Sequence, residues 1–152
     1  MNLVDSYGWL EYFADGINAD FFSAAIESTA TLLVPTICIL EVFKSTLQQR
    51  GEDCALQVAA LMSQGKVVEL STPVALRSAK LSHEMKLPLA DSVILATAQL
   101  HDAEIWTQDA DFKGLPNIHY IEPKFRSWMR RYGRKGQSIR IISAEGRYTV
   151  PL

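Results

Sequence analysis

Two carboxylates lie close together in the stretch WTQDADF, residues 106–112. Asp109 and Asp111 follow the short apolar run 103–107, which has the length and composition of a buried strand. A solvated surface loop would explain the pair. A functional site would also explain it, because open parallel sheets bind ligands beyond the carboxyl ends of their strands. The choice depends on whether other acids of the chain occupy similar positions.

Asp5 and Asp91 also stand at unusual positions. Asp5 directly follows the apolar start of the chain, where a first strand would end, although it could be a simple turn residue. On a helical wheel, Asp91 falls on an otherwise apolar stripe. That stripe contains Ile94, Leu95 and Ala98. A carboxylate buried there needs a compensating charge or metal, whereas an acid in a first helical turn simply interacts well with the helix dipole, and both explanations stay open.

Glu41 lies in the apolar segment ICILEVF. Its neighbours on the wheel are Lys44, Ser45 and Gln48, so Glu41 alone is expected to be a solvated or ion-paired acid. Acids from separate elements could nevertheless converge on one pocket, where each would raise the pKa of the others. Hard cations relieve such repulsion, and oxygen ligands favour magnesium or manganese over zinc or copper. These ions stabilise a transferring phosphoryl group and activate water.

The elements that must position these acids follow from periodicity and turn residues. The expected helices span residues 7–13, 19–30, 36–50, 52–64, 73–86 and 88–101. The expected strands span residues 1–4, 32–35, 66–70, 104–107 and 117–121. Ser6 and Thr36 are the expected N-caps of their helices. Strands that alternate with helices predict βαβ units and a mainly parallel sheet covered on both faces.

Composition excludes several other classes of protein. The 152 residues are 48% hydrophobic and 21% charged, which suits one globular domain with a short appendage. No run of about 18 apolar residues could span a membrane. The N-terminus lacks the pattern of a signal peptide, so we expect a cytoplasmic protein without a membrane partner. Cys38 and Cys54 are wrongly spaced for a zinc site or a CxxC pair and are expected to be free thiols.

Charge is distributed unevenly along the chain. Residues 1–123 carry sixteen acids and seven bases, a net charge of −9, whereas residues 124–152 carry one acid and eight bases, a net charge of +7. The basic end contains Trp128 and Tyr132 and could contact phosphates while its aromatic rings stack on bases. It could also be a solvated tail. Residues 125–132 could form a short amphipathic helix.

Four segments, in this order, resemble the PIN-domain ribonucleases and especially the VapC-type toxins of bacterial toxin–antitoxin pairs. They are LVDSYGWLEYF at 3–13, PTICILEVFK at 35–44, LPLADSVILATA at 87–98 and WTQDADFKGLPNI at 106–118. The resemblance implies a nuclease domain over residues 1–122, with a three-layer α/β/α fold around a parallel sheet of about five strands. Residues 123–152 depart from the family and would be a basic C-terminal extension or an expression-derived tail.

The resemblance also implies an active site and partners. The residues that match the catalytic acids of the family are Asp5, Glu41, Asp91 and Asp109, with Asp111 as an auxiliary metal ligand. They would hold one or two Mg²⁺ or Mn²⁺ ions, and Ser6 and Thr107 stand where a hydroxyl could support the ligands. In the family, metal-dependent cleavage of RNA is inhibited by a cognate antitoxin. The family also suggests a homodimer.

Two other functions stay open on the sequence. A PIN-like module could bind RNA or a protein without cutting. A phosphoacceptor receiver domain also has a doubly wound sheet with acids at its strand ends, but it would need an acid pair after its first strand and a lysine after a late strand. Here Asp5 is single, and Lys113 lies beyond the acids in a loop.

Overall fold

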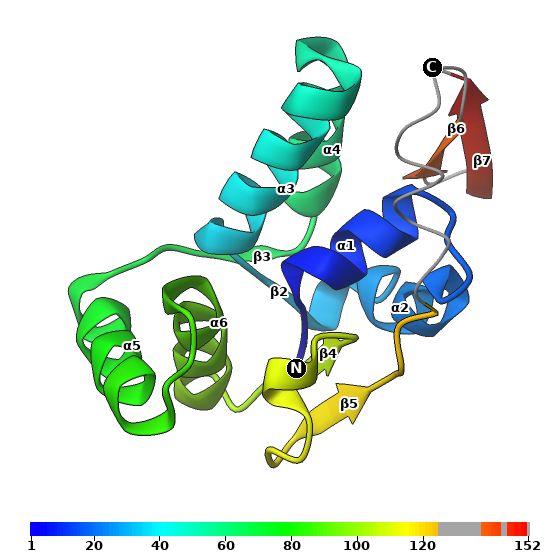
Figure 1. Cartoon of the computed structure of the whole chain (residues 1–152). Coiled ribbons are helices and arrows are strands. Elements are labelled where there is room, and N and C mark those ends of the chain that lie inside the picture. Colours follow the sequence, from blue (N-terminus) through cyan, green and yellow to red (C-terminus); the bar gives the residue numbers. More distant parts are fainter. Residues whose placement is uncertain (125–137, 144–145, 152) are drawn as a thin grey trace.

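The structure, a computed structural model, describes residues 1–124, 138–143 and 146–151 (Figure 1). At its centre lies a sheet of five strands in the order β3-β2-β1-β4-β5, in which each pair of neighbours is parallel. The strands are β1 (Asn2–Val4), β2 (Leu32–Pro35), β3 (Lys66–Val68), β4 (Glu104–Thr107) and β5 (Ile118–Tyr120). The order changes direction at β1, so the carboxyl ends of β1 and β4 flank the point where open α/β sheets bind ligands.

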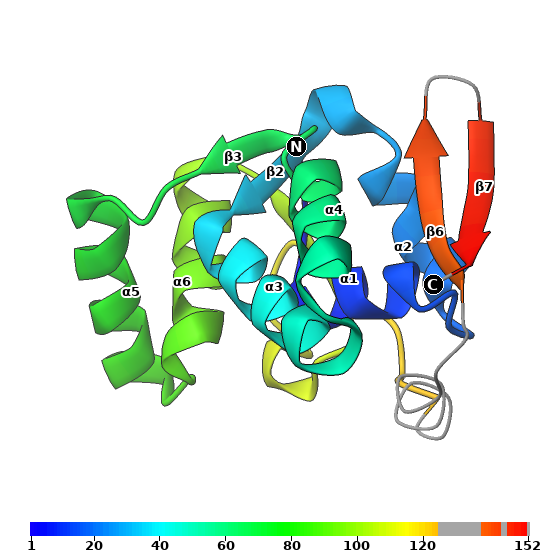
Figure 2. The ribbon, with the colours of Figure 1, turned by 90° about the horizontal axis from the view of Figure 1, so that it is seen from above.

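Helices cover both faces of this sheet. They are α1 (Ser6–Phe13), α2 (Ala19–Ile26), α3 (Thr36–Arg50), α4 (Glu52–Met62), α5 (Thr72–Met85) and α6 (Leu89–Leu100), with short 3₁₀ turns η1 (Thr29–Thr31) and η2 (Ala110–Phe112). Helices α1 and α2 pack on the face that carries Val4, and α6, with α5 beside it, packs against Ile105 on the other face (Figures 1 and 2). Helices α3 and α4 lie side by side and extend beyond the sheet (Figure 1). The predicted three-layer α/β fold is confirmed.

The pattern of buried residues, together with the residues that end the helices, explains why these segments form strands and helices. All four residues of β2 are buried, as expected for a central parallel strand whose two faces are both covered. Helix α3 ends at Gly51, whose φ of 88° lies in the region that favours glycine. The apolar stripe predicted for α6 faces the core, where Ile94 is 1% exposed and Leu95 is 4% exposed. Cys38 and Cys54 are free and buried, as predicted.

Two predicted helix caps are wrong, because the hydroxyl groups bond elsewhere. The N-cap of α1 is Asp5, whose Oδ1 accepts a hydrogen bond from the Gly8 N–H at 2.6 Å. The hydroxyl of Ser6 instead contacts Glu41. Thr36 does not cap α3; its Oγ1 accepts from the Leu70 N–H at 3.3 Å and so ties α3 to the segment after β3.

The end of the chain differs from the sequence expectation. Strands β6 (Ser138–Ser143) and β7 (Gly146–Pro151) pair in an antiparallel hairpin that the sequence did not predict. The hairpin is a separate two-stranded sheet and lies near α1 and α2 in both views (Figures 1 and 2). The short helix predicted over residues 125–132 lies outside the described residues.

Topology excludes one of the open functions. Receiver domains have the flavodoxin-like strand order 2-1-3-4-5, whereas this sheet has the order 3-2-1-4-5. The receiver alternative is therefore rejected. Within the described ranges, none of the helices has both the length and the apolarity to cross a bilayer.

Helix α1 approaches β1 closely at Gly8. A Cβ atom built there would lie 2.6 Å from Phe22 Cε1 and 2.7 Å from Val4 Cγ1, and both side chains are fully buried. We predict that Gly8→Ala destabilises the protein. Overpacking of this kind costs about 1–3 kcal/mol, which exceeds the gain of at most about 1 kcal/mol in helix propensity. Urea unfolding of both proteins measures the difference, and an unchanged midpoint would contradict this close packing.

Candidate functional site

A chain of hydrogen bonds links the ends of the two central strands. Thr107, the last residue of β4, donates its hydroxyl proton to Asp5 Oδ2 at 2.5 Å. The same Oγ1 accepts from the Asp109 N–H at 2.8 Å. Asp5 Oδ1 accepts a hydrogen bond from the Gly8 N–H, and the backbone N–H of Asp5 donates to the Trp106 carbonyl at 3.2 Å. Asp5 is therefore fixed in position from both sides of the crevice between β1 and β4.

Three carboxylates gather beside this chain of hydrogen bonds. One oxygen each from Asp91, Asp109 and Asp111 lies within 4.8 Å of the others. Asp91 comes from the first turn of α6, and the other two come from the turn η2 after β4. Asp109 Oδ1 accepts from the Asp111 N–H at 2.9 Å, which fixes the spacing of that pair. Asp109 and Asp111 thus lie beside a third acid that precedes Asp109 by 18 residues in the chain.

Glu41 approaches the site from α3. Its Oε2 accepts a hydrogen bond from the Ser6 hydroxyl at 2.5 Å, across 35 residues of sequence. Its charge also raises the pKa of Asp91. The structure therefore favours a place for Glu41 at the edge of the acid cluster over the polar stripe that its helical neighbours suggest. Both supporting hydroxyls expected from the sequence, on Ser6 and Thr107, contact a carboxylate.

Burial makes the charge of Asp5 costly. The side chain is only 2% exposed, and desolvation raises the pKa of Asp5 to about 7. Hydrogen bonds from Thr107 and Gly8 act in the opposite sense and favour the charged form, while the charges of Asp109 and Asp91 raise the pKa further. A carboxyl group in this state gains strongly from any cation that arrives beside it.

Asp91 is in the same condition although it is only half-buried. Desolvation first, and then the charges of Asp109, Asp111 and Glu41, raise its pKa to about 7. The N-terminal dipole of α6 favours the charged form, but such a dipole contributes only about 0.3–1 kcal/mol at a partly exposed position. The dipole therefore does not offset the crowding of like charges, and the favourable-dipole explanation of Asp91 is incomplete.

The donor atoms of this cluster suit a hard divalent cation. They are all carboxylate oxygens, the ligand type that magnesium and manganese prefer. Without a cation, burial and crowding raise the pKa values of Asp5 and Asp91 to about 7, and a nearby cation would stabilise their charged forms. Asp91, Asp109 and Asp111 could contribute ligands directly, and Asp5 and Glu41 lie close enough for their charges to interact with this group.

The sequence patterns did not identify one residue near the acids, Tyr7. Tyr7 lies between Ser6 and Gly8 in the first turn of α1 and is 49% exposed. Burial first raises the pKa of its phenol, and four carboxylates raise it further: Asp109, Glu41, Asp91 and Asp5. Its place directly after Asp5 was the available signal, because the first turn of a helix that follows a strand faces the same crevice as the end of that strand.

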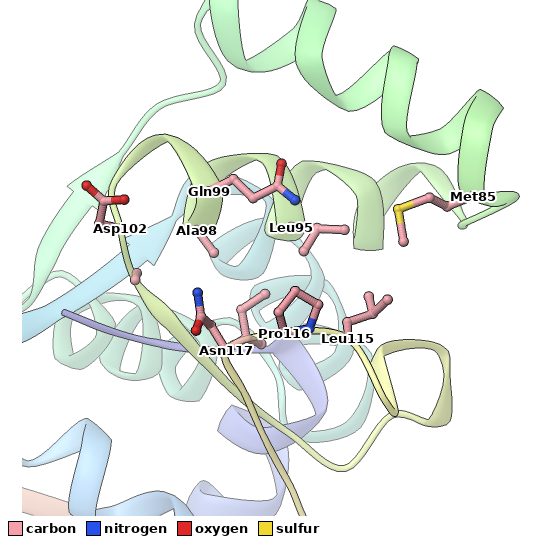
Figure 3. Close-up of a pocket in the computed structure, with 10 residues that line it drawn as sticks. Met85, Leu95, Ala98, Gln99, Asp102, Leu115, Pro116 and Asn117 are labelled. Carbon is pink, nitrogen blue, oxygen red and sulfur yellow. The ribbon is translucent and has the colours of Figure 1, made fainter.

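A cavity of about 200 Å³ lies between α6 and the segment before β5 (Figure 3). Leu95, Ala98 and Gln99 of α6 form one wall, and Leu115, Pro116 and Asn117, which precede β5, form the other (Figure 3). Asp102 and Ala103, also in its lining, precede β4, so this cavity opens toward the amino ends of the strands. Its lining contains none of the clustered acids.

The fold and the acids agree with a known family. The sequence profile of the PIN domain family matches residues 3–117. This chain belongs to the PIN-domain family. The matched range contains the whole acid cluster of this PIN domain, together with the hydroxyls of Ser6 and Thr107. No curated protein sequence matched the chain.

Solved structures with the same fold include several toxin–antitoxin proteins. A toxin–antitoxin complex from Klebsiella pneumoniae superposes with a TM-score of 0.67 and 28% identity, covering 78% of this chain and 96% of that one. VapBC2 from Rickettsia felis, bound to a promoter DNA fragment, superposes with a TM-score of 0.62 and 12% identity, covering 79% of this chain and 96% of that one. VapC20 from Mycobacterium tuberculosis, a toxin that cleaves the sarcin–ricin loop, superposes with a TM-score of 0.61 and 15% identity. The match covers 74% of this chain and 92% of that one. The last two comparisons support the fold alone.

The raised pKa of Asp91 gives this PIN domain a distinctive pH dependence of stability. Between pH values of about 4 and 7 the unfolded chain loses the Asp91 proton while the folded, metal-free protein keeps it. The contribution of Asp91 is therefore neutral below this window and destabilising above it. We predict that Asp91→Asn raises the melting temperature in EDTA at pH 8 and has little effect at pH 4.

Asp53 supplies a matched control, because it is an exposed aspartate in the first turn of α4. Asp53→Asn should show no comparable gain at pH 8. Thermal melts at both pH values measure all three proteins. An equal change in melting temperature for the two variants would show that the neighbouring acids do not raise the pKa of Asp91.

Proposed function

We propose that this PIN domain is a metal-dependent endoribonuclease, the toxin of a type II toxin–antitoxin pair, and that it hydrolyses phosphodiester bonds of RNA. The observation that carries the proposal is the approach of Asp91, Asp109 and Asp111 within 4.8 Å, next to a buried Asp5. Such a cluster is costly to the fold without a cation, and none of these acids forms an ion pair with a basic side chain in the described part of the chain. Membership of the PIN-domain family supports the same conclusion.

Each acid has a distinct part in this proposal. Asp5, Asp91 and Asp109 would hold Mg²⁺ or Mn²⁺, Glu41 would complete the acidic wall, and Asp111 would assist from its exposed position. A bound ion of this type lowers the pKa of a water molecule and balances the charge that develops on the phosphate. The hydroxyl of Thr107 keeps Asp5 and the backbone of Asp109 at a fixed separation, so the ligands are oriented before any ion or RNA arrives.

The decisive experiment is cleavage of total RNA by the purified protein in magnesium, manganese or EDTA, followed by mapping of the product ends. We predict cleavage only with a divalent ion. Asp5→Asn, Asp91→Asn and Asp109→Asn should each reduce the rate by about 100-fold or more, because a catalytic ion contributes several kcal/mol and each 1.4 kcal/mol is a factor of ten. Asp111→Asn should cost less, because water can replace an exposed auxiliary ligand.

Thermal melts with manganese separate ligand loss from unfolding. The wild-type protein should gain stability from the ion by mass action, and the three aspartate variants should gain less. Asp53→Asn should behave as wild type in both assays. If RNA is bound but not cut in either ion, the chain is a non-cleaving PIN module. If Asp109→Asn cleaves at the wild-type rate, the cluster is not the active site.

We also propose a cognate antitoxin and a homodimer. Residues 1–123 carry a net charge of −9, and the crowded carboxylates would attract an arginine side chain as readily as a metal ion. The guanidinium fork can pair with a carboxylate through two parallel hydrogen bonds. The similar Klebsiella structure is itself a toxin–antitoxin complex, which supports a protein partner for this chain.

The partner can be tested by expression of the chain together with its neighbouring genes. We predict that a small protein copurifies with it, that the complex does not cleave RNA, and that removal of the small protein restores metal-dependent cleavage. Light scattering of the released protein reports its oligomeric state. Recovery of an active protein without any partner from that expression would contradict the toxin–antitoxin proposal and leave the nuclease proposal intact.

A further inference from the structure

Gln108 is a buried amide directly beside the acid cluster. It stands between Thr107, whose hydroxyl bonds to Asp5, and Asp109, which belongs to the cluster. Its side chain is 8% exposed, although glutamine is mostly found on protein surfaces. A buried carboxamide needs hydrogen-bond partners, because its polar atoms have been removed from water. The partner of Gln108 therefore bears on how the segment that carries Asp109 is held.

That partner is Asn18, which lies 90 residues earlier in the chain. Asn18 is 3% exposed, and its Nδ2 donates to Gln108 Oε1 at 3.1 Å and to the Glu122 carbonyl at 3.0 Å. A backbone carbonyl can only accept, so the atom of Asn18 that faces Glu122 is the amide nitrogen. Gln108 must then present its oxygen to that nitrogen. The orientation of both amides therefore follows from one backbone carbonyl.

The side chain of Asn18 makes these bonds in place of a helix cap. Asn18 is the N-cap residue of α2, where an asparagine side chain often accepts from an N–H of the first turn. Here it forms no such bond. The backbone N–H of Asn18 donates to Glu11 Oε1 at 3.0 Å, and Glu11 is a buried residue of α1. The backbone of Asn18 is thus fixed to α1, and its side chain is bonded to the segments that follow β4 and β5.

Two helix N-cap residues therefore hold the segment from which Asp109 projects. Asp5, the N-cap of α1, accepts from the Thr107 hydroxyl, and Asn18, the N-cap of α2, donates to Gln108. The Thr107 hydroxyl also accepts from the Asp109 N–H at 2.8 Å. A segment held at one residue can still turn about that contact, whereas contacts at two successive residues from different helices restrict its orientation. The direction in which Asp109 leaves β4 thus depends on both.

We propose that Asn18 is a positioning residue for the metal-binding acids. Through Gln108 it holds the backbone that carries Asp109, and so keeps the Asp109 carboxylate within reach of Asp91. Asn18 itself contacts neither the ion nor the substrate. This inference rests on the proposed metal-dependent function. Residues that orient metal ligands from behind commonly contribute about 10–100-fold to metal affinity or activity, because the ligands are in place before the ion binds.

Calorimetric titration of the metal-free protein with Mn²⁺ tests the proposal without RNA. Gln108→Met keeps a side chain of similar length, removes the acceptor, and leaves the bond from Asn18 to Glu122 intact. It should weaken manganese binding about tenfold. Asn18→Ala should weaken binding at least as much. The double variant should bind manganese as weakly as Asn18→Ala alone, because both substitutions break the same hydrogen bond.

Val58→Ala is the control for a general loss of stability. Val58 is 1% exposed in α4, a helix that supplies none of the five acids. This variant should melt at a lower temperature and bind manganese as the wild-type protein does. If Asn18→Ala does not fold, Gln108→Met carries the test.

Three results would overturn the role of Asn18. They are wild-type manganese affinity in Gln108→Met, losses that add in the double variant, and an equal loss of affinity in Val58→Ala. In each of these cases the wild-type protein still binds manganese, so the proposed metal-dependent function stands. If the wild-type protein itself binds no manganese, that function fails, and the role of Asn18 fails with it.

Discussion

Repulsion between like charges at one end of a parallel sheet is the constraint on which this site depends. The carboxyl ends of β1 and β4 each deliver an acid to one crevice, and α6 points Asp91 into the same place. Without a cation, burial and crowding hold Asp5 and Asp91 near the middle of their titration at neutral pH. At and above neutral pH the protein therefore carries an electrostatic cost that a positively charged ligand would remove.

The sheet topology turns this cost into a defined geometry. Because β1 and β4 are neighbours, the separation of Asp5 from Thr107 is set by the spacing of hydrogen-bonded strands, about 4.8 Å, and not by a loop. The hydroxyl of Thr107 bonds to Asp5 and also accepts from the Asp109 N–H, so the backbone of Asp109 is positioned relative to both strands. The helices contribute the remaining acids from outside the sheet. The end of β1 fixes Asp5, helix α6 brings Asp91, and turn η2 brings Asp109 and Asp111.

The sequence predicted the fold well because its signals were local. Apolar periodicity with flanking glycine and proline placed α3 at Thr36–Arg50 and β2 at Leu32–Pro35, with the bounds that the structure shows. The helix caps were predicted wrongly because the hydroxyls of Ser6 and Thr36 bond to groups 35 and 34 residues away. The hairpin of β6 and β7 was missed although residues 138–141 and 147–150 alternate polar and apolar side chains, which is the pattern of a strand.

The acids of the site also divide into those whose position follows from local sequence and those whose position depends on contacts with distant residues. Asp109 and Asp111 could be paired from their spacing alone, since a single turn carries both. The place of Glu41 could not, because its helical neighbours indicated a polar stripe and the contact that positions it comes from α1. Tyr7 was overlooked for a related reason: an exposed aromatic residue gives no periodic signal, and only the assembled site shows which charges surround it.

The separation of the acids from the apolar core has an evolutionary consequence. The core lies beneath the site in residues such as Leu3, Phe22 and Ile105, each of which is almost completely buried. Loss of an acid would leave that core intact and relieve repulsion, so the stability of the fold alone would favour substitution of these acids by neutral residues. The five carboxylates are therefore a feature that folding stability by itself does not preserve.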